Sequence, residues 1–303
     1  MPKIITHDGV AHLDEVWAIA SLFLANPALK SAEIIRTRDI PEEAFEDKTT
    51  IIVDVGRKYE PQNLNFDHHQ IDAPERSPAE PLAAAGLIWQ AFGKRICEKT
   101  LKEENIQVQE ISKISREVEE DLITTIDFLD CEGANYDACR NPRKLAQVAG
   151  MARMISASIQ SDEDFLNAVN LVEKLIRETV LECGRKERLN QELKTNPPKK
   201  DYLELSEPGH YWKNPVAAFP NVKFVVFEQP KNNEWAAQST QHPDSLCPLP
   251  WRGKIETDLA TESGVKGAKF CHTSGFYITA DSKEAILKMI NNSIEYGKLQ
   301  KTA

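Results

Sequence analysis

Residues 51–70 read Ile-Ile-Val-Asp-Val-Gly-Arg-Lys-Tyr-Glu-Pro-Gln-Asn-Leu-Asn-Phe-Asp-His-His-Gln. The β-branched run at residues 51–53 follows a polar segment and predicts a buried strand. Asp54 ends that strand, and an Asp-His-His sequence follows at 67–69. A carboxylate at the end of a buried strand is unfavourable unless it is paired or bound to a metal. Because ligands collect at the carboxyl ends of strands in open α/β sheets, this stretch predicts both a sheet and a site.

The first fifteen residues have the same organisation. Residues 3–6 predict a strand, His7 ends it, and His12 and Asp14 precede an apolar helix at 16–25. Four of the seven histidines fall in the two strand-end loops: His7, His12, His68 and His69. Any one of them alone would be read as a hydrogen-bonded core histidine, but together with the aspartates of the same loops they favour a metal site. This mixture of imidazole nitrogen and carboxylate oxygen suits Mn²⁺, and also Fe²⁺, Co²⁺ or Zn²⁺.

Strand and helix signals alternate along residues 1–130. This alternation predicts an α/β domain, a mostly parallel sheet flanked by helices on both faces. Apolar residues at helical spacing extend the domain through helices at 143–157 and 162–193. The segment Asn196-Pro197-Pro198-Lys199-Lys200 predicts a boundary, after which strand signals indicate a second, smaller α+β domain. The predicted domains are residues 1–195 and 200–303.

The composition restricts the partners of this protein. Its net charge of −10 argues against strong nonspecific binding to long nucleic acid, which needs a basic surface, but is compatible with a short oligonucleotide. The six cysteines form no C-x-x-C pair, as expected for free thiols in a reducing compartment. A strand predicted at residue 3 leaves no room for a signal peptide, and the longest apolar run, at 16–25, is about half a membrane span. We therefore expect a cytoplasmic protein without membrane contact.

Several short motifs resemble a known family. They are Thr6-His7-Asp8-Gly9 with His12-Leu13-Asp14-Glu15, Glu33-Ile34-Ile35-Arg36-Thr37-Arg38-Asp39, Val53-Asp54-Val55-Gly56, Asp67-His68-His69-Gln70, Ala85-Gly86-Leu87-Ile88, Pro250-Trp251-Arg252-Gly253 and His272-Thr273-Ser274-Gly275-Phe276. The N-terminal motifs resemble the DHH phosphoesterase superfamily, and the last two point to its melanocyte-proliferating-gene (Myg) family. Members of that family are also described as metal-dependent protein hydrolases and as RNA exonucleases. The resemblance covers nearly the whole chain and implies a DHH-type first domain, a substrate-binding second domain and hydrolase activity.

The resemblance also implies a division of labour around two divalent metal ions, with Mn²⁺ expected. His7, His12 and Asp54 would hold one ion. Asp14, Asp54, His68 and a later acidic residue would hold the other. His69 would face the phosphate, so the expected catalytic residues are His69, Asp14 and Asp54. The chain departs from the superfamily pattern because His12 replaces an aspartate in a loop that is one residue longer.

The later acidic ligand has two candidates on one face of a predicted helix, Asp127 and Asp130. We favour Asp127 because it lies nearer the body of the helix, and we keep Asp130 as the alternative. Asp67 is expected to fix a histidine tautomer rather than to bind metal. Glu15 is expected at a helix start because the helix dipole favours an acidic side chain there.

Candidate substrate contacts fall into three groups of residues. Trp251, Arg252 and Gly253 offer a stacking face, a bidentate phosphate donor and an open backbone, although an ordinary turn could contain the same residues. Arg36 and Arg38 follow the second strand and could reach the same cleft, or pair with surface acids such as Asp39.

The third group of substrate contacts, His272, Ser274 and Gly275, lies in a predicted strand at 269–279, where glycine is unfavourable. By resemblance, a stretch of this kind in the second domain binds the substrate phosphate or carboxylate.

Three functions follow from these residues. The leading one is a metal-dependent phosphoesterase that uses a two-metal mechanism, a 3′-to-5′ exonuclease on short RNA or DNA. The second keeps the site but takes a small phosphate compound, such as pyrophosphate or a cyclic dinucleotide. The third is a non-catalytic, metal-binding regulatory protein, against which the complete set of ligand types argues. The sequence leaves a homodimer open.

Overall fold

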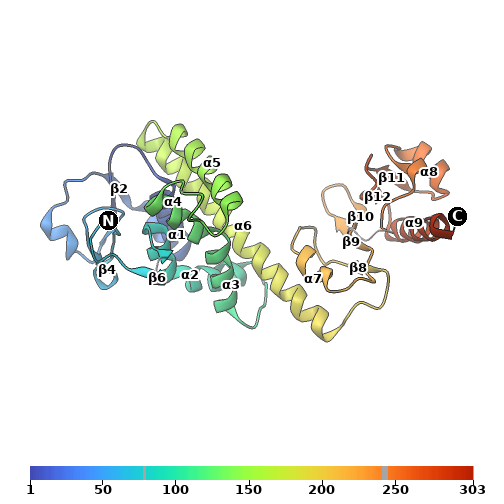
Figure 1. Cartoon of the computed structure of the whole chain (residues 1–303), viewed down its shortest axis with the longest axis horizontal. Coiled ribbons are helices and arrows are strands. Elements are labelled where there is room, and N and C mark those ends of the chain that lie inside the picture. The colour runs from blue at the N-terminus through green and yellow to red at the C-terminus, as the bar shows by residue number, and fades with distance from the viewer. Residues whose placement is uncertain (78–79, 241–244, 303) are drawn as a thin grey trace. The chain divides into compact units, whose positions relative to one another are not determined.

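The computed structural model describes residues 1–77, 80–240 and 245–302. The chain divides into two compact units, Met1–Gly184 and Arg185–Ala303 (Figure 1). The first is an α/β unit and the second is a smaller α+β unit, so the predicted fold class is confirmed. Within the described ranges, every helix is too short or too polar to cross a membrane.

The sheet of the first unit is parallel except at one edge. Its order is β2-β1-β3-β5-β4, and only the β4–β5 pair is antiparallel. The strands are β1 (Lys3–Thr6), β2 (Glu33–Arg36), β3 (Thr50–Val53), β4 (Tyr59–Glu60) and β5 (Asn65–Phe66). Ile5 pairs with Ile52, so the chain leaves β1 at His7 and β3 at Asp54 at the same level of the same edge.

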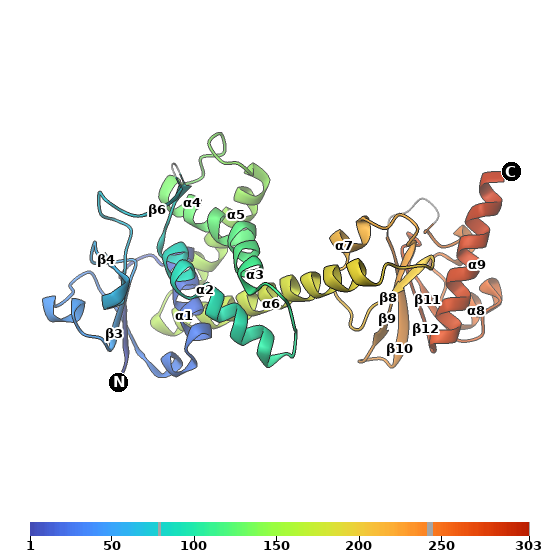
Figure 2. The same ribbon diagram turned by 90° about the horizontal axis from the view of Figure 1, so that it is seen from below.

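The two faces of this sheet are covered differently. Side chains alternate along a strand, so Ile4 packs with helices α1 (Leu13–Ala25) and α2 (Ala84–Glu103), while Ile5 faces the other way. Figure 2 shows the helices of this unit gathered on one side. On the opposite face, among the residues that the structure describes, the short 3-10 helix η2 (Glu42–Phe45) contributes Phe45 to a small cluster with Ile5 and Ile52. The expectation of helices on both faces is corrected, because α1 and α2 pack on one face and a 3-10 turn packs on the other.

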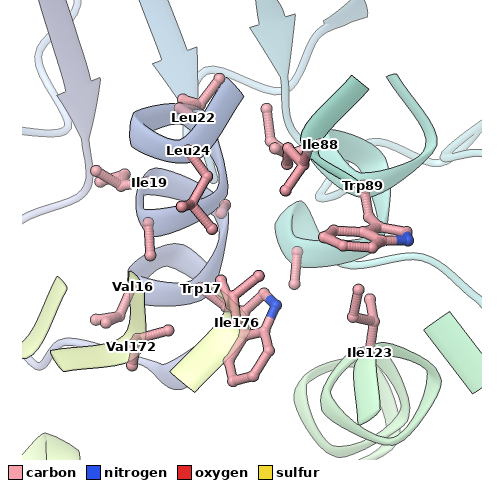
Figure 3. Packing of buried hydrophobic residues seen from close by; sticks show 14 of the residues in the cluster. Val16, Trp17, Ile19, Leu22, Leu24, Ile88, Trp89, Ile123, Val172 and Ile176 are labelled. Atoms are coloured by element: carbon pink, nitrogen blue, oxygen red, sulfur yellow. The ribbon is translucent and has the colours of Figure 1, made fainter. Parts of the chain in front are cut away.

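Helix α1 is the centre of the core. All thirteen of its residues are buried, as expected for a helix enclosed on every side rather than on one stripe. Trp17 of α1 and Trp89 of α2 are among the largest fully or almost fully buried side chains, and Val172 and Ile176 of α6 (Asp162–Thr195) complete the cluster (Figure 3).

The remaining helices of the first unit follow α2 in the chain. The helical stretch at 111–132 is interrupted by a π-helical turn at 119–123, a feature that is frequent near functional sites. Residues 75–77 and 80–81 pair as two short antiparallel strands. The elements are β6 (Glu75–Ser77), β7 (Glu80–Pro81), α3 (Ile111–Val118), η4 (Glu119–Ile123), α4 (Thr124–Glu132), α5 (Pro142–Ser158) and α6 (Asp162–Thr195). Helix α6 contributes Val172 and Ile176 to the first core and Leu189 and Leu193 to a core of the second unit.

The second unit is built on a sheet of order β11-β12-β10-β9-β8, antiparallel except for the β8–β9 pair. Its elements are β8 (Tyr202–Glu204), α7 (Lys213–Ala217), β9 (Phe224–Gln229), β10 (Glu234–Ser239), η5 (Leu249–Trp251), α8 (Glu256–Ser263), β11 (Ala268–Cys271), β12 (Tyr277–Ala280) and α9 (Lys283–Thr302). The single strand predicted at 269–279 is instead the hairpin β11–β12. Gly275 sits in its turn with φ +75°, a conformation that favours glycine, so the glycine that looked unfavourable in a strand is required by the turn.

Candidate metal centre

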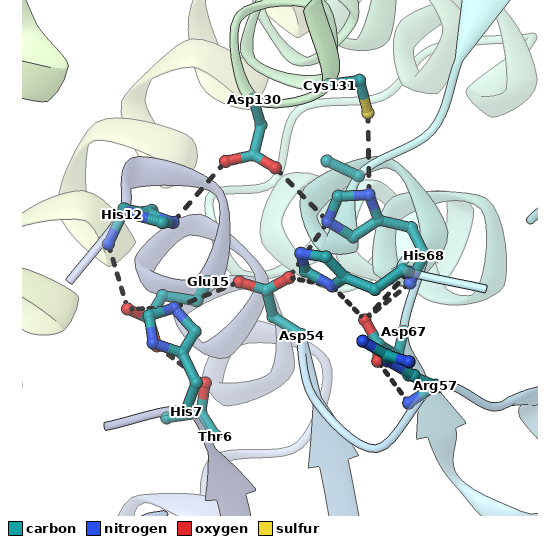
Figure 4. A network of polar contacts seen from close by, with 12 residues as sticks. Thr6, His7, His12, Glu15, Asp54, Arg57, Asp67, His68, Asp130 and Cys131 are labelled. Atoms are coloured by element: carbon teal, nitrogen blue, oxygen red, sulfur yellow. Dashed lines mark hydrogen bonds and ion pairs between the residues drawn. The ribbon is translucent and has the colours of Figure 1, made fainter. Parts of the chain in front are cut away.

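His7 and Asp54 meet at the carboxyl edge of the parallel sheet. His7 Nε2 lies 3.4 Å from Asp54 Oδ2, because β1 and β3 are neighbours and end at the same level. His68, from the loop after β5, approaches the other carboxylate oxygen: its Nε2 lies 3.0 Å from Asp54 Oδ1 (Figure 4). The two oxygens of Asp54 therefore face different histidines.

The backbone of Asp54 is strained. Its φ is +58°, in the left-handed region that non-glycine residues seldom occupy and that clusters at functional sites. Burial of the side chain opposes ionisation, but contacts with His68 and His7 outweigh it and lower the pKa of Asp54 to about 2. Asp54 is thus a buried carboxylate held in its charged form.

Asp14 lies in the first turn of α1 and is buried. Neither of its carboxylate oxygens has a hydrogen-bond partner among the described residues. Burial, with the nearby charges of Asp54 and Asp130, raises the pKa of Asp14 well above its usual value. A buried carboxylate without donors, beside two others, needs a cation to be stable as an anion.

Glu15 also belongs to this cluster, although the sequence analysis expected it only at the start of a helix. It is fully buried, and its Oε1 lies 3.2 Å from His7 Nε2. Glu15 also accepts hydrogen bonds from Thr6 Oγ1 at 2.7 Å and from the His12 backbone at 3.0 Å. The available signal was the capping box formed by His12 and Glu15, which fixes the loop between β1 and α1.

The structure brings Asp130 to the cluster and leaves Asp127 outside it. Asp130 Oδ2 lies 3.3 Å from His68 Nε2, and Oδ1 lies 3.8 Å from His12 Nδ1. Cys131, which the sequence did not single out, has its Sγ 3.6 Å from His68 Nδ1. The position of Asp130 at the end of α4 supports it over Asp127 as the later acidic ligand.

Asp127 has a different environment. It accepts hydrogen bonds from the backbone of Gly86 at 2.9 Å and Ala83 at 3.2 Å, and it pairs with Arg76 at 2.7 Å. Burial raises the pKa of Asp127 to about 7, although Arg76 acts in the opposite direction. A Cβ at Gly86 would collide with the Asp127 carboxylate, which explains why glycine stands in that motif. The preference for Asp127 as the later acidic metal ligand is therefore corrected. Its carboxylate oxygens already pair with Arg76 and accept hydrogen bonds from the backbone at the start of α2.

Asp67 orients the histidine pair. Its Oδ1 accepts from the His68 backbone at 2.7 Å and lies 2.7 Å from His69 Nδ1. The hydrogen bond that His69 donates to Asp67 raises the pKa of His69. The His69 side chain is 52% exposed, so its second ring nitrogen can reach a ligand that enters from solvent. This geometry agrees with the expectation that Asp67 fixes a histidine tautomer.

The donor atoms fit divalent metal ions. Ligand atoms within each of four overlapping groups lie within 4.8 Å of one another. The groups are His7, His12 and Asp54; Asp54, Asp67, His68 and His69; His12, Asp14 and Asp130; and His68, Asp130 and Cys131. Asp54, Asp130 and two histidines each belong to two groups, and the donor set suits divalent metals that accept both imidazole nitrogen and carboxylate oxygen, such as Mn²⁺, Fe²⁺ or Zn²⁺.

Arg36, the last residue of β2, and Arg38 both contact the loop that carries His7. Arg36 donates to the Gly9 carbonyl at 2.9 Å and stacks over Phe165 at 4.7 Å. Arg38 donates to Asp8 at 3.1 Å, and its terminal nitrogen lies 3.4 Å from His7 Nδ1. The Arg38 side chain is 65% exposed, so it is the better placed of the two to meet a phosphate.

In the second unit, two separate motifs come together. Arg252 Nε donates to the Cys247 carbonyl at 3.0 Å, and a Cβ on Gly275 would lie 2.5 Å from the same nitrogen. In the β11–β12 turn, His272 Nδ1 lies 2.7 Å from Ser274 Oγ. Gly253 has φ +77° and donates to the Cys271 carbonyl, which fixes its backbone.

Trp251 does not offer the predicted stacking face. Only 5% of it is exposed, because it packs in the core of the second unit with Phe224 and Ile286. The prediction that Trp251 stacks on substrate is therefore corrected, because its indole is part of the hydrophobic core of the second unit.

A parallel sheet with an acid–histidine cluster at its carboxyl edge, followed by a separate α+β unit, defines a two-domain α/β protein with a candidate metal centre. The chain belongs to the Uncharacterised protein family (UPF0160), whose model matches residues 3–294. It is 30% identical to the MYG1 exonuclease of Homo sapiens over 331 residues, covering 95% of this chain and 84% of that protein. It is 29% identical to the MYG1 protein of Dictyostelium discoideum over 324 residues, covering 94% of each.

Among solved structures, the chain is similar to RecJ in complex with Mn²⁺ from Thermus thermophilus. The similarity covers 98% of this chain and 52% of that chain, with 13% identity and a TM-score of 0.27.

Proposed function

We propose that this protein is a metal-dependent phosphoesterase that hydrolyses phosphodiester bonds with two divalent ions, Mn²⁺ being the best suited. The observation that carries the proposal is the position of Asp54 between His7 and His68, with one carboxylate oxygen toward each. Placed in this way, Asp54 would be able to contribute one oxygen to each of two ions. The orphaned, buried carboxylate of Asp14 supports it, since only a cation would compensate its charge.

In this proposal, some side chains bind the metal ions and others contact the phosphate. The metal ligands would be His7, His12, Asp14, Asp54, His68 and Asp130. When bound, such ions activate a water molecule and neutralise charge on the phosphate. His69, oriented by Asp67 and open to solvent, would donate a hydrogen bond to the phosphate or the leaving oxygen. Arg38, whose exposed side chain lies beside His7, would bind a phosphate oxygen.

We further propose that the substrate is a short RNA or DNA strand, cut from its 3′ end. The relatives in rat, mouse, cattle and man carry the name exonuclease, which supports this class. The net charge of −10 favours a short strand over a long duplex. Because the same net charge is also compatible with a small phosphate compound, such a compound is the second candidate substrate. Residues 200–303 would supply substrate contacts through Arg252, Gly253, His272, Ser274 and Gly275, and the protein would act in the cytoplasm.

A substrate panel tests the proposal. Metal-stripped protein is reloaded with Mn²⁺ and given a short oligonucleotide, pyrophosphate and bis-p-nitrophenyl phosphate. We expect shortening of the oligonucleotide from the 3′ end, loss of metal and activity in Asp54→Asn, and retention of both in Asp39→Asn, whose side chain is on the surface. Hydrolysis of pyrophosphate alone would select the second candidate. Metal binding without hydrolysis of any substrate would favour a regulatory protein.

A further inference from the structure

The two ring nitrogens of His68 face different partners. Nε2 lies 3.0 Å from Asp54 Oδ1 and 3.3 Å from Asp130 Oδ2, on the side of the candidate metal centre. Nδ1 lies 3.6 Å from the thiol sulfur of Cys131 (Figure 4). Because the two nitrogens of an imidazole point away from each other, an ion held with these carboxylates would bind Nε2, and Nδ1 would carry the ring proton. Cys131 therefore lies behind the ring, where its sulfur can accept a hydrogen bond from Nδ1–H.

His7 is held in the same way by a different group. Its Nε2 lies 3.2 Å from Glu15 and 3.4 Å from Asp54, and its Nδ1 lies 2.8 Å from the backbone carbonyl of Asp8. Both histidines thus present Nε2 to carboxylates and Nδ1 to an acceptor behind the ring. Acceptors of this kind fix the tautomer and the orientation of a metal-binding histidine, and their loss typically weakens metal binding about 10–100-fold.

The acceptors behind the two histidines differ in chemistry and in exposure. The acceptor behind His7 is a backbone carbonyl, whereas the acceptor behind His68 is a thiol, which solvent-borne reagents can modify. Four of the six cysteines are buried, Cys139 is half-buried and Cys131 is exposed, although the His68 side chain is only 7% exposed. The orientation of His68 therefore depends on a contact that a reagent can reach from solvent.

We propose that Cys131 is the positioning residue for His68, and that metal retention by the centre depends on the state of its thiol. A low-molecular-weight disulfide would change that state by exchange: the Cys131 sulfur bonds to one sulfur of the disulfide, and the other sulfur leaves as a thiol that takes the proton. The added group would displace the Cys131 sulfur from His68, so the ion bound through His68 would be released more readily. The inference rests on the metal centre of the proposed function and is independent of hydrolysis.

Titration of the metal-stripped whole chain with Mn²⁺, in the absence of substrate, tests this role. Free Mn²⁺ is measured by electron paramagnetic resonance. We expect Cys131→Ala to weaken the binding of one equivalent about 10-fold, because sulfur is a weak acceptor and its loss falls at the lower end of the usual range. Cys131→Ser keeps an acceptor and should bind within about 3-fold of the wild type. Cys139→Ala is the matched control, since Cys139 belongs to none of the metal-ligand groups found among the described residues.

A reversible thiol reagent provides a second measurement. Methyl methanethiosulfonate converts an accessible thiol to a methyl disulfide and releases methanesulfinate. We expect it to lower the Mn²⁺ affinity of the wild type and of Cys139→Ala about 10-fold, and dithiothreitol should restore that affinity. Cys131→Ser should not respond to either reagent.

Three results would overturn the inference. The first is wild-type affinity in Cys131→Ala. The second is a sulfur-to-cobalt charge-transfer band in Co²⁺-loaded protein that Cys131→Ser lacks, which would make Cys131 a metal ligand. The third is a lower Tm of metal-free Cys131→Ala, which would indicate a structural role. Thiol-dependent metal binding in a protein that hydrolyses nothing would reject the proposed function and keep the inference, whereas hydrolysis by a centre insensitive to Cys131 would do the reverse.

Discussion

Asp130 Oδ2 lies 3.3 Å from His68 Nε2, although the two residues come from the end of α4 and from the loop after β5. Asp127, one turn earlier on the same helix, instead pairs with Arg76 and accepts a hydrogen bond from the backbone at the start of α2. One helix therefore supplies one aspartate to the candidate metal centre and another to the core.

The first prediction separates these two aspartates. Asp130→Asn should lose about one equivalent of metal, because a neutral amide is a poorer ligand for a divalent ion. Asp127→Asn should keep its metal and lose thermal stability instead. Elemental analysis after dialysis measures the first effect, and thermal unfolding measures the second. Metal loss in Asp127→Asn with full occupancy in Asp130→Asn would reverse the assignment.

A second prediction separates the two histidines of the loop after β5. His68→Ala should weaken metal binding, since His68 lies between Asp54 and Asp130. His69→Ala should keep its metal but lower kcat about 10²–10³-fold, as expected when a single donor to developing charge is removed. Equal metal loss in both variants would show that His69 is a ligand as well.

Arg252 provides a test of the substrate contact in the second unit. Arg252→Ala should raise KM for an oligonucleotide about 10–100-fold, as for the loss of a hydrogen bond to a charged group. The KM for a small ester should change less, because the ester lacks the additional phosphates that Arg252 would bind. Steady-state kinetics on both substrates gives the comparison. The matched control is Lys254→Ala, which removes only an ion pair to Glu262. Equal effects on the two substrates would mean that Arg252 stabilises the turn and does not touch substrate.

The fourth prediction concerns Arg76. The Arg76 side chain is 16% exposed and pairs with the fully buried Asp127 and with Glu119. Arg76→Met would leave a buried carboxylate without its counter-charge, so we expect a loss of about 3–5 kcal/mol in the free energy of unfolding. Arg140→Met is the control, because Arg140 is 87% exposed and its pair with Glu80 should contribute about 0–1 kcal/mol. Urea unfolding followed by circular dichroism measures both, and equal losses would contradict the buried-pair argument.

Much of the candidate centre could be predicted from the sequence. The β-branched runs at 3–6 and 51–53 fix two strands, and parallel strands of one sheet end at one edge. That rule alone brings His7 and Asp54 together, and the register confirms that they leave their strands at the same level. The local spacing of Asp67, His68 and His69 likewise makes a backbone-anchored turn, because the short aspartate side chain bonds to amides one and two residues ahead.

Tertiary packing decided what spacing could not. Asp127 and Asp130 lie only about 60° apart around a helix, so their different partners depend on how α4 packs against α2 and the β6–β7 hairpin. Trp251 could be a stacking face or a core residue from its type alone, and its burial beside Phe224 depends on a strand far away in the sequence. The contact of the Cys131 thiol joins the end of α4 to the loop after β5, and neither segment predicts that contact alone. Periodicity and turn residues report local backbone conformation, so the sequence by itself determined most of the elements and the edge of the sheet where the site lies. Which oxygen faces which histidine, and which donor is left without a partner, is set by contacts between distant segments, and these exist only in the folded chain.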